Sequence, residues 1–163
     1  MKPSGFTLIE LIAIMIIVGI MAVVALPRMS ALDGFDEPGL HDKLKAGLQF
    51  ARKTAVASRR YVCLDVTGGV GGRVSLRLEN AAPESTLGNC ALTAGSDLTL
   101  PAPDKTTGCA SNEICAETTL SLSSTSTSFR FDPLGRLSPL TNVTFTTTNQ
   151  PNIVIDAETG NVQ

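Results

Sequence analysis

The chain opens with an uninterrupted apolar segment that limits what it can fold into. From Phe6 to Leu26 the only ionisable side chain is that of Glu10. As an α-helix rising about 1.5 Å per residue, this segment reaches about 30 Å, the thickness of the hydrocarbon core of a bilayer. The sequence therefore predicts a membrane-spanning helix over residues 6–27. A carboxylate in such a helix costs about 2.5 to 3.5 kcal/mol, so we expect Glu10 to pair with an amine.

The residues before this helix do not fit an ordinary secretory signal. Such a signal has its small-residue cleavage site after the apolar core, whereas here Gly5 precedes it and the polar leader is confined to residues 1–5. The hexapeptide Gly-Phe-Thr-Leu-Ile-Glu at residues 5–10 resembles the leader junction of type IV pilins and of type II secretion pseudopilins. The resemblance implies that a prepilin peptidase cuts between Gly5 and Phe6 and that the new amine of Phe6 is methylated. It also implies that Glu10 pairs with the N-terminal ammonium group of a neighbouring subunit.

The same resemblance implies partners, a location and two further residue roles. Gly19 and Pro27 fall where such pilins carry a helix-loosening glycine and proline. The expected partners are other pilins, through the N-terminal helix, and the peptidase. Lys2 is the only charge in the leader, which fits an N-terminus in the cytoplasm. We therefore expect a single-pass protein of the bacterial inner membrane with a periplasmic head, which later joins a pilus or pseudopilus. A plain signal anchor is the alternative, but it does not explain the Gly5–Phe6 junction.

Residues 28–60 predict a periplasmic helical segment with a break near residues 33–39, where two glycines and a proline occur. After the break, an apolar stripe follows at helical spacing: Leu40, Leu44, Leu48, Ala51 and Ala55. Charged and polar side chains, including His41, lie on the opposite face. This stripe is expected to be the surface on which the head packs.

Residues 61–163 predict a β-rich globular head. Alternating patterns at residues 61–66 and 73–79 flank a glycine-rich tip and indicate a hairpin. Short alternating runs recur near residues 120–122, 129–131, 143–145 and 153–155, and Leu98 and Leu100 hint at a strand in the loop-rich stretch 80–117. The expected fold is α+β and type IV pilin-like. In it, a long N-terminal helix, with a membrane-spanning first half, packs on β-sandwich-like antiparallel sheets.

Three further segments resemble the GspH/FimT subfamily of minor pseudopilins and minor pilins. They are the helix end at residues 51–59 and the two turn-containing patterns at residues 131–136 and 154–162. The resemblance implies a minor pilin or pseudopilin that acts in the initiation of assembly or near the filament tip. Whether the filament is a secretion pseudopilus or an adhesion, motility or DNA-uptake pilus stays open.

Four cysteines follow the helix and are expected on the oxidising side of the membrane: Cys63, Cys90, Cys109 and Cys115. Disulfides are the expected outcome, and three pairings are possible. One of them closes a short loop from Cys109 to Cys115 and leaves Cys63 with Cys90. A four-thiolate zinc site is the alternative, but the close C-x-x-C pairs that usually form one are missing.

The sequence argues against catalysis and against a cofactor, a metal or a small-molecule substrate. Its single histidine lies on a polar helix face, and its serines and carboxylates follow no catalytic pattern. A DNA-binding minor pilin for natural transformation is the alternative function, with Arg136 and Arg130 as its contacts. However, residues 135–138 read Gly-Arg-Leu-Ser and lack the second arginine of the Gly-Arg-x-Arg loop of such pilins. From Tyr61 onward the chain also has only five Lys and Arg residues against ten Asp and Glu residues, so nucleic acid is not expected as a partner.

Overall fold

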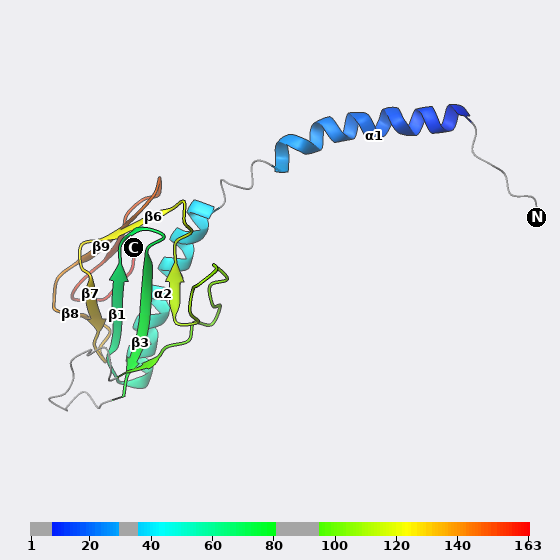
Figure 1. The fold of residues 1–163 in the computed structure, drawn as a ribbon. Helices are drawn as coiled ribbons and strands as arrows, with labels where there is room; N and C mark the ends of the chain where they lie inside the picture. The colour runs from blue at the N-terminus through cyan, green and yellow to red at the C-terminus, as the bar shows by residue number, and fades with distance from the viewer. Residues whose placement is uncertain (1–7, 30–35, 81–94) are drawn as a thin grey trace, which may run out of the picture. The chain divides into compact units, whose positions relative to one another are not determined.

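A computed structural model of the chain describes residues 8–29, 36–80 and 95–163. The chain divides into two compact units, Met1–Asp36 and Glu37–Gln163, and each is considered by itself. The first unit contains helix α1, and the second unit is the head. Figure 1 shows the elements of both units.

Helix α1 covers Leu8–Met29 and continues through Gly19 and Pro27. The side chains described for it, from Leu8 to Gly19, are all exposed. Phe6, where the expected membrane segment begins, lies outside the described residues. No helix in the described part of the chain meets the length and apolarity required to cross a membrane.

Helix α2 covers Asp36–Ser58 and is the helix of the head. The predicted apolar stripe is confirmed, because its members are all buried: Leu40, Leu44, Leu48, Ala51 and Ala55. Side chains three or four positions apart share one face of a helix, and this face belongs to the core that the sheets also line. Figure 1 shows α2 lying along one side of the strands.

The first turns of α2 differ in detail from the expectation. The predicted break at residues 33–39 lies partly outside the described residues, and from Asp36 onward the chain is helical. His41, expected on the polar face, is only 15% exposed and lies 3.4 Å from the Asp42 carboxylate. The polar stripe of α2 is therefore narrower than the sequence pattern indicates.

The described part of the head holds ten strands in two antiparallel sheets. One sheet has the order β4-β3-β1-β7-β8, with β5 also paired to β3, and the other has the order β10-β9-β6-β2. The strands of the first sheet are β1 Val62–Thr67, β3 Arg73–Glu79, β4 Gly95–Asp97, β5 Glu113–Cys115, β7 Ser128–Phe131 and β8 Leu137–Ser138. Those of the second are β2 Gly69–Val70, β6 Ser121–Ser124, β9 Val143–Thr147 and β10 Ile153–Ile155.

Both sheets and α2 contribute to a single hydrophobic core. Phe129 of β7 links the two sheets, since its ring meets Phe131 of its own strand edge to face at 6.1 Å and Phe145 of β9 at 6.0 Å. Every buried apolar residue of the described chain lies between Leu40 and Val162. Among the described residues the head thus has a hydrophobic core of its own, as a domain that can fold independently does.

The strand predictions succeed where the alternation is regular and fail in the loop-rich stretch. Strands β1 and β3 form the expected hairpin, with Leu64 opposite Leu76, and β2 in its glycine-rich tip pairs with β6 of the other sheet. The prediction of a strand at Leu98 and Leu100 is wrong, because β4 ends at Asp97. Leu100 is instead buried in an irregular segment, where its amide donates to the Ser111 carbonyl at 2.9 Å.

The last residues of the chain protect the outer edge of β10. Val162 forms a β-bridge with Ile155. The amide of Gln163 donates to the carbonyl of Val154 at 3.0 Å, and the amide of Val154 donates back at 3.1 Å. These contacts satisfy backbone groups that an open sheet edge would leave unpaired.

Candidate functional site

The first candidate site is the N-terminal assembly segment. Its processing residues, Gly5 and Phe6, lie outside the described residues. Glu10 lies in the first turn of α1, where the helix dipole favours a negative charge. Around it the helix surface is apolar, with Leu8 78% exposed and Ile9 71% exposed. A continuous exposed apolar surface of this kind marks contact with a membrane or another protein.

The second candidate site is a corner of the head where the three subfamily-like segments meet. We call it the signature corner, and it consists of Arg52 with the turns 132–136 and 156–160. Arg52 of α2 donates from Nε to the carbonyl oxygen of Gly135 at 3.3 Å. The amide of Leu137 donates to the carbonyl of Ala157 at 2.9 Å, which joins the two turns. Segments far apart in sequence are thus fixed against each other.

The first turn of the signature corner is organised by the carboxylate of Asp132, which is 10% exposed. Its Oδ1 accepts hydrogen bonds from the amides of Leu134 at 2.9 Å and Arg136 at 2.8 Å. Its Oδ2 accepts one from Nε of Arg136 at 2.9 Å. Charge-assisted bonds of this geometry are strong, so Arg136 has a structural partner within its own turn.

The second turn is organised in the same way by Asp156. Its Oδ1 accepts from the hydroxyl of Thr159 at 2.7 Å and from the Thr159 amide at 2.9 Å. These bonds, that from the hydroxyl first, hold the pKa of Asp156 below its ordinary value of 3.8. The amide of Gly160 then donates to the Asp156 carbonyl at 2.8 Å.

The two turns touch at their glycines. Gly135 has a φ of 81° and Gly160 a φ of 61°, a region that favours glycine. A Cβ on Gly160 would lie 1.8 Å from the carbonyl oxygen of Gly135. The corner is therefore closed by backbone contact, which leaves no room for a side chain and gives these residues a structural role.

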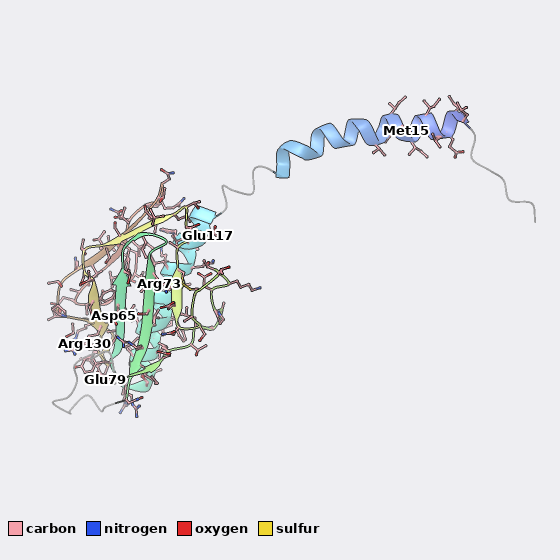
Figure 2. The ribbon with its side chains drawn as sticks, in the orientation of Figure 1. Met15, Asp65, Arg73, Glu79, Glu117 and Arg130 are labelled. Carbon is pink, nitrogen blue, oxygen red and sulfur yellow. A yellow bond between two sulfur atoms is a disulfide. The ribbon has the colours of Figure 1, made fainter. Side chains whose placement is uncertain are left out.

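The two residues expected to contact DNA both have partners within the head. Arg130, labelled in Figure 2, lies on β7 with its guanidinium carbon 4.7 Å from the centre of the Tyr61 ring. Its Nε donates to the hydroxyl of Ser138 at 3.2 Å. Arg136 is held by Asp132 as described. Arg73 and Arg77 are also paired, with Glu113 and Asp65 respectively. The two expected contacts thus have partners within the head, whereas Arg59 and Arg60, which follow α2, are exposed and have no ion pair among the described residues.

A disulfide joins Cys109 to Cys115, with a distance of 2.01 Å between the sulfur atoms, and confirms the expectation of disulfide bonding. Cys63 is also disulfide-bonded, and Cys90 lies outside the described residues. The carboxylate of Glu113 lies close to Cys109 and Cys115, as three ligands of a metal ion would. Because the two sulfurs are bonded to each other, they are not available as thiolate ligands.

Sequence reasoning missed a groove between α2 and the segment 100–105. It has a volume of about 410 Å³ and is lined by Lys43, Ala46, Gly47, Phe50, Leu100–Lys105 and Ile114. The sequence signal for it is the pair of small residues Ala46 and Gly47, which lie between the larger Lys43 and Phe50 on the side of α2 that lines the groove. We call it the α2–loop groove.

Taken together, these features define a class of protein. A helix with one carboxylate near its start, followed by a head in which a second helix packs on antiparallel sheets, is the architecture of a pilin-like subunit. Residues 41–160 match the family described as Type II transport protein GspH, and residues 1–26 match the prokaryotic N-terminal methylation motif. The chain belongs to the GspH family of pseudopilins, which are structural proteins rather than enzymes, and it is a minor pilin or pseudopilin of a type II secretion system or type IV pilus.

Two solved structures illustrate the likeness. The minor pseudopilin EpsH from the type 2 secretion system of Vibrio cholerae is 11% identical, with a TM-score of 0.51 over 78% of this chain and 94% of that one. The type IV minor pilin FimU of Pseudomonas aeruginosa is 20% identical, with a TM-score of 0.48 over 77% of this chain and 90% of that one. The likeness to EpsH shows the pilin-like α+β fold. A search of curated proteins found no match.

Proposed function

We propose that the chain is a minor subunit that acts in the initiation of filament assembly or occupies a position near the filament tip. It assembles with other pilins through α1. The observation that carries this proposal is the exposed apolar surface of α1 with Glu10 in its first turn. The match of residues 1–26 to the methylation motif supports it, since that motif implies anchoring in the inner membrane before assembly.

The proposed mechanism starts with storage in the inner membrane. The apolar segment holds the precursor in a single pass, with the head in the periplasm. A prepilin peptidase then removes residues 1–5, and the amine of Phe6 becomes a methylated cation. The carboxylate of Glu10 then lies in an apolar medium, where a charge is costly.

Assembly then relieves this cost. When helices bundle, Glu10 of one subunit meets the terminal ammonium group of another. A charge pair in a medium of low dielectric constant attracts strongly, and a helix displaced along its axis would leave both charges unpaired. The pair therefore fixes the axial register of the entering subunit.

The test is the variant Glu10→Gln, which keeps the shape of the side chain and removes its charge. We expect normal amounts in the membrane fraction and at least a tenfold loss from sheared filaments. Glu117→Gln, which neutralises an exposed carboxylate of the head, is the matched control and should assemble normally. Normal incorporation of the Glu10→Gln subunit would contradict the proposal.

Processing is tested separately with Gly5→Leu. A bulky residue before the scissile bond should block cleavage, so intact mass spectrometry should find the full-length chain in membranes. The unchanged protein should have lost five residues and gained one methyl group on Phe6. Loss of the leader from the Gly5→Leu chain would show that another protease acts here.

A further inference from the structure

The α2–loop groove has apolar walls that the fold holds in place. Phe50 and Ala46 form the helix side, Leu100 and Pro101 form the loop side, and Ile114 lines it from β5. Gly47 has a structural reason to be glycine here, because a Cβ would lie 2.3 Å from Cδ1 of Ile114. The absence of a side chain at residue 47 thus lets Ile114 approach the helix closely.

The carboxylate of Asp104 fixes the loop wall. Its side chain is only 3% exposed and accepts from Nζ of Lys43 on α2 at 3.2 Å. The hydroxyl of Thr106 at 2.9 Å and the amide of Cys115 at 3.3 Å also donate to this carboxylate. The loop is therefore tied to α2 and to β5, and the groove exists before any partner arrives.

The charges around the groove are not balanced. Asp104 is the only carboxylate that lines the groove, and it is already engaged in an ion pair with Lys43 and in hydrogen bonds within the head. Lys105 is exposed and has no ion pair among the described residues, although the other four basic residues after Tyr61 all have partners. Lys43 stays 52% exposed despite its pairing. The groove thus combines an apolar floor with a cationic rim.

We propose that the α2–loop groove binds an apolar segment carrying a carboxylate, presented by the head of a neighbouring filament subunit. Its size and lining fit a few bulky apolar side chains, and Lys105 supplies the counter-charge for an acidic neighbour of those side chains. A small polar metabolite fits poorly, because its recognition needs several convergent polar groups and the groove offers few. The identity of the partner as a filament subunit rests on the proposed function.

The chemistry of the groove can be tested on the isolated head, residues 37–163, with the aromatic sulfonate dye 8-anilinonaphthalene-1-sulfonate. The dye combines an apolar body with an anionic group. We expect one site on the folded head, weakened roughly three- to tenfold by Lys105→Glu and abolished by Ala46→Trp, which fills the groove from an exposed position. Lys53→Glu and Ala57→Trp, at exposed positions of α2 outside the groove, are the matched controls. Unchanged binding in both groove variants would overturn the proposal.

The partner is tested in the full chain within the assembled filament. A photo-crosslinking residue at position 46 should join the chain to another subunit at a segment with an apolar residue beside a carboxylate, and Lys105→Glu should reduce this product several-fold. Crosslinks only within the chain itself, or only to basic segments, would overturn the proposal. Glu10→Gln separates the two ideas: if that subunit still enters filaments while Lys105→Glu reduces the crosslinked product, the proposed function fails in its mechanism and the groove proposal stands.

Discussion

A single added methyl group at Gly160 should destabilise the head far more than its size suggests. In the signature corner, a Cβ at this position would lie 1.8 Å from the carbonyl oxygen of Gly135 and 3.1 Å from Nε of Arg52. The nearest atom belongs to the backbone, so it cannot move aside as the end of a flexible side chain can. In the Gly160→Ala variant the two turns must therefore separate.

The magnitude follows from three contributions. An L-residue at a φ of 61° costs about 1 kcal/mol. Separating overpacked backbone costs about 1 to 3 kcal/mol, and loss of the bond from Arg52 to Gly135 costs about 1 kcal/mol more. The expected total is about 3 to 5 kcal/mol, a large share of the roughly 5 to 15 kcal/mol that stabilises a typical domain.

Gly71→Ala is the matched control, because Gly71 has a φ of 67° and nothing within 4 Å of its would-be Cβ. Both variants share the backbone penalty and the reduced entropy of the unfolded chain, so their difference isolates the close contact. Thermal unfolding of residues 37–163, with disulfides intact, should give a Tm at least about 6 °C lower for Gly160→Ala than for Gly71→Ala. Equal Tm values would refute the reasoning.

Three further predictions concern the rest of the head. Burial alone would raise the pKa of Asp104, but hydrogen bonds from Thr106, Lys43 and Cys115 outweigh it and hold this pKa below 3.8. A lowered pKa stabilises the fold above pH 3.8, and this stabilisation is lost as the pH falls through the lowered value. Asp104→Asn should therefore be less stable than the unchanged head at pH 7 in urea titrations, and the difference should shrink as the pH is lowered below 3.8. Replacing both Cys109 and Cys115 by serine should cost about 2 kcal/mol in urea unfolding, since the bond closes only a short loop, and an unchanged midpoint would show that the loop is ordered without it. In gel shifts at 150 mM salt the head should not retard DNA below about 100 μM, and salt-sensitive micromolar binding lost in Arg136→Ala would favour the DNA-binding alternative instead.

Most of the head's architecture was accessible from sequence because its patterns are local. The stripe of Leu40, Leu44 and Leu48 repeats every four residues, and the strands around Leu64 and Leu76 alternate regularly, so periodicity alone indicates which side is buried. The pairing of Asp132 with Arg136 also lies within one turn. Patterns of this kind can be read from neighbouring residues alone, without knowledge of the tertiary structure.

The features that sequence could not give depend on contacts between distant segments. The bond from Arg52 to Gly135 joins residues 83 positions apart, and the α2–loop groove needs a helix, an irregular loop and β5 to come together. Alternation also places Glu79 on the same face of β3 as the charged Arg73 and Arg77, yet Glu79 is only 2% exposed. Burial here is decided by what covers the sheet, which the strand's own residues do not encode.

Residues 162 and 163 pair with the outer edge of β10, and this pairing affects how heads can associate with one another. An open sheet edge can pair with a strand of almost any other chain, and such pairing is unselective and hard to reverse. Because residues of the same chain already occupy this edge, neighbouring heads have one fewer sheet edge through which they could aggregate. Association between subunits then depends on side-chain contacts, which can distinguish one partner from another.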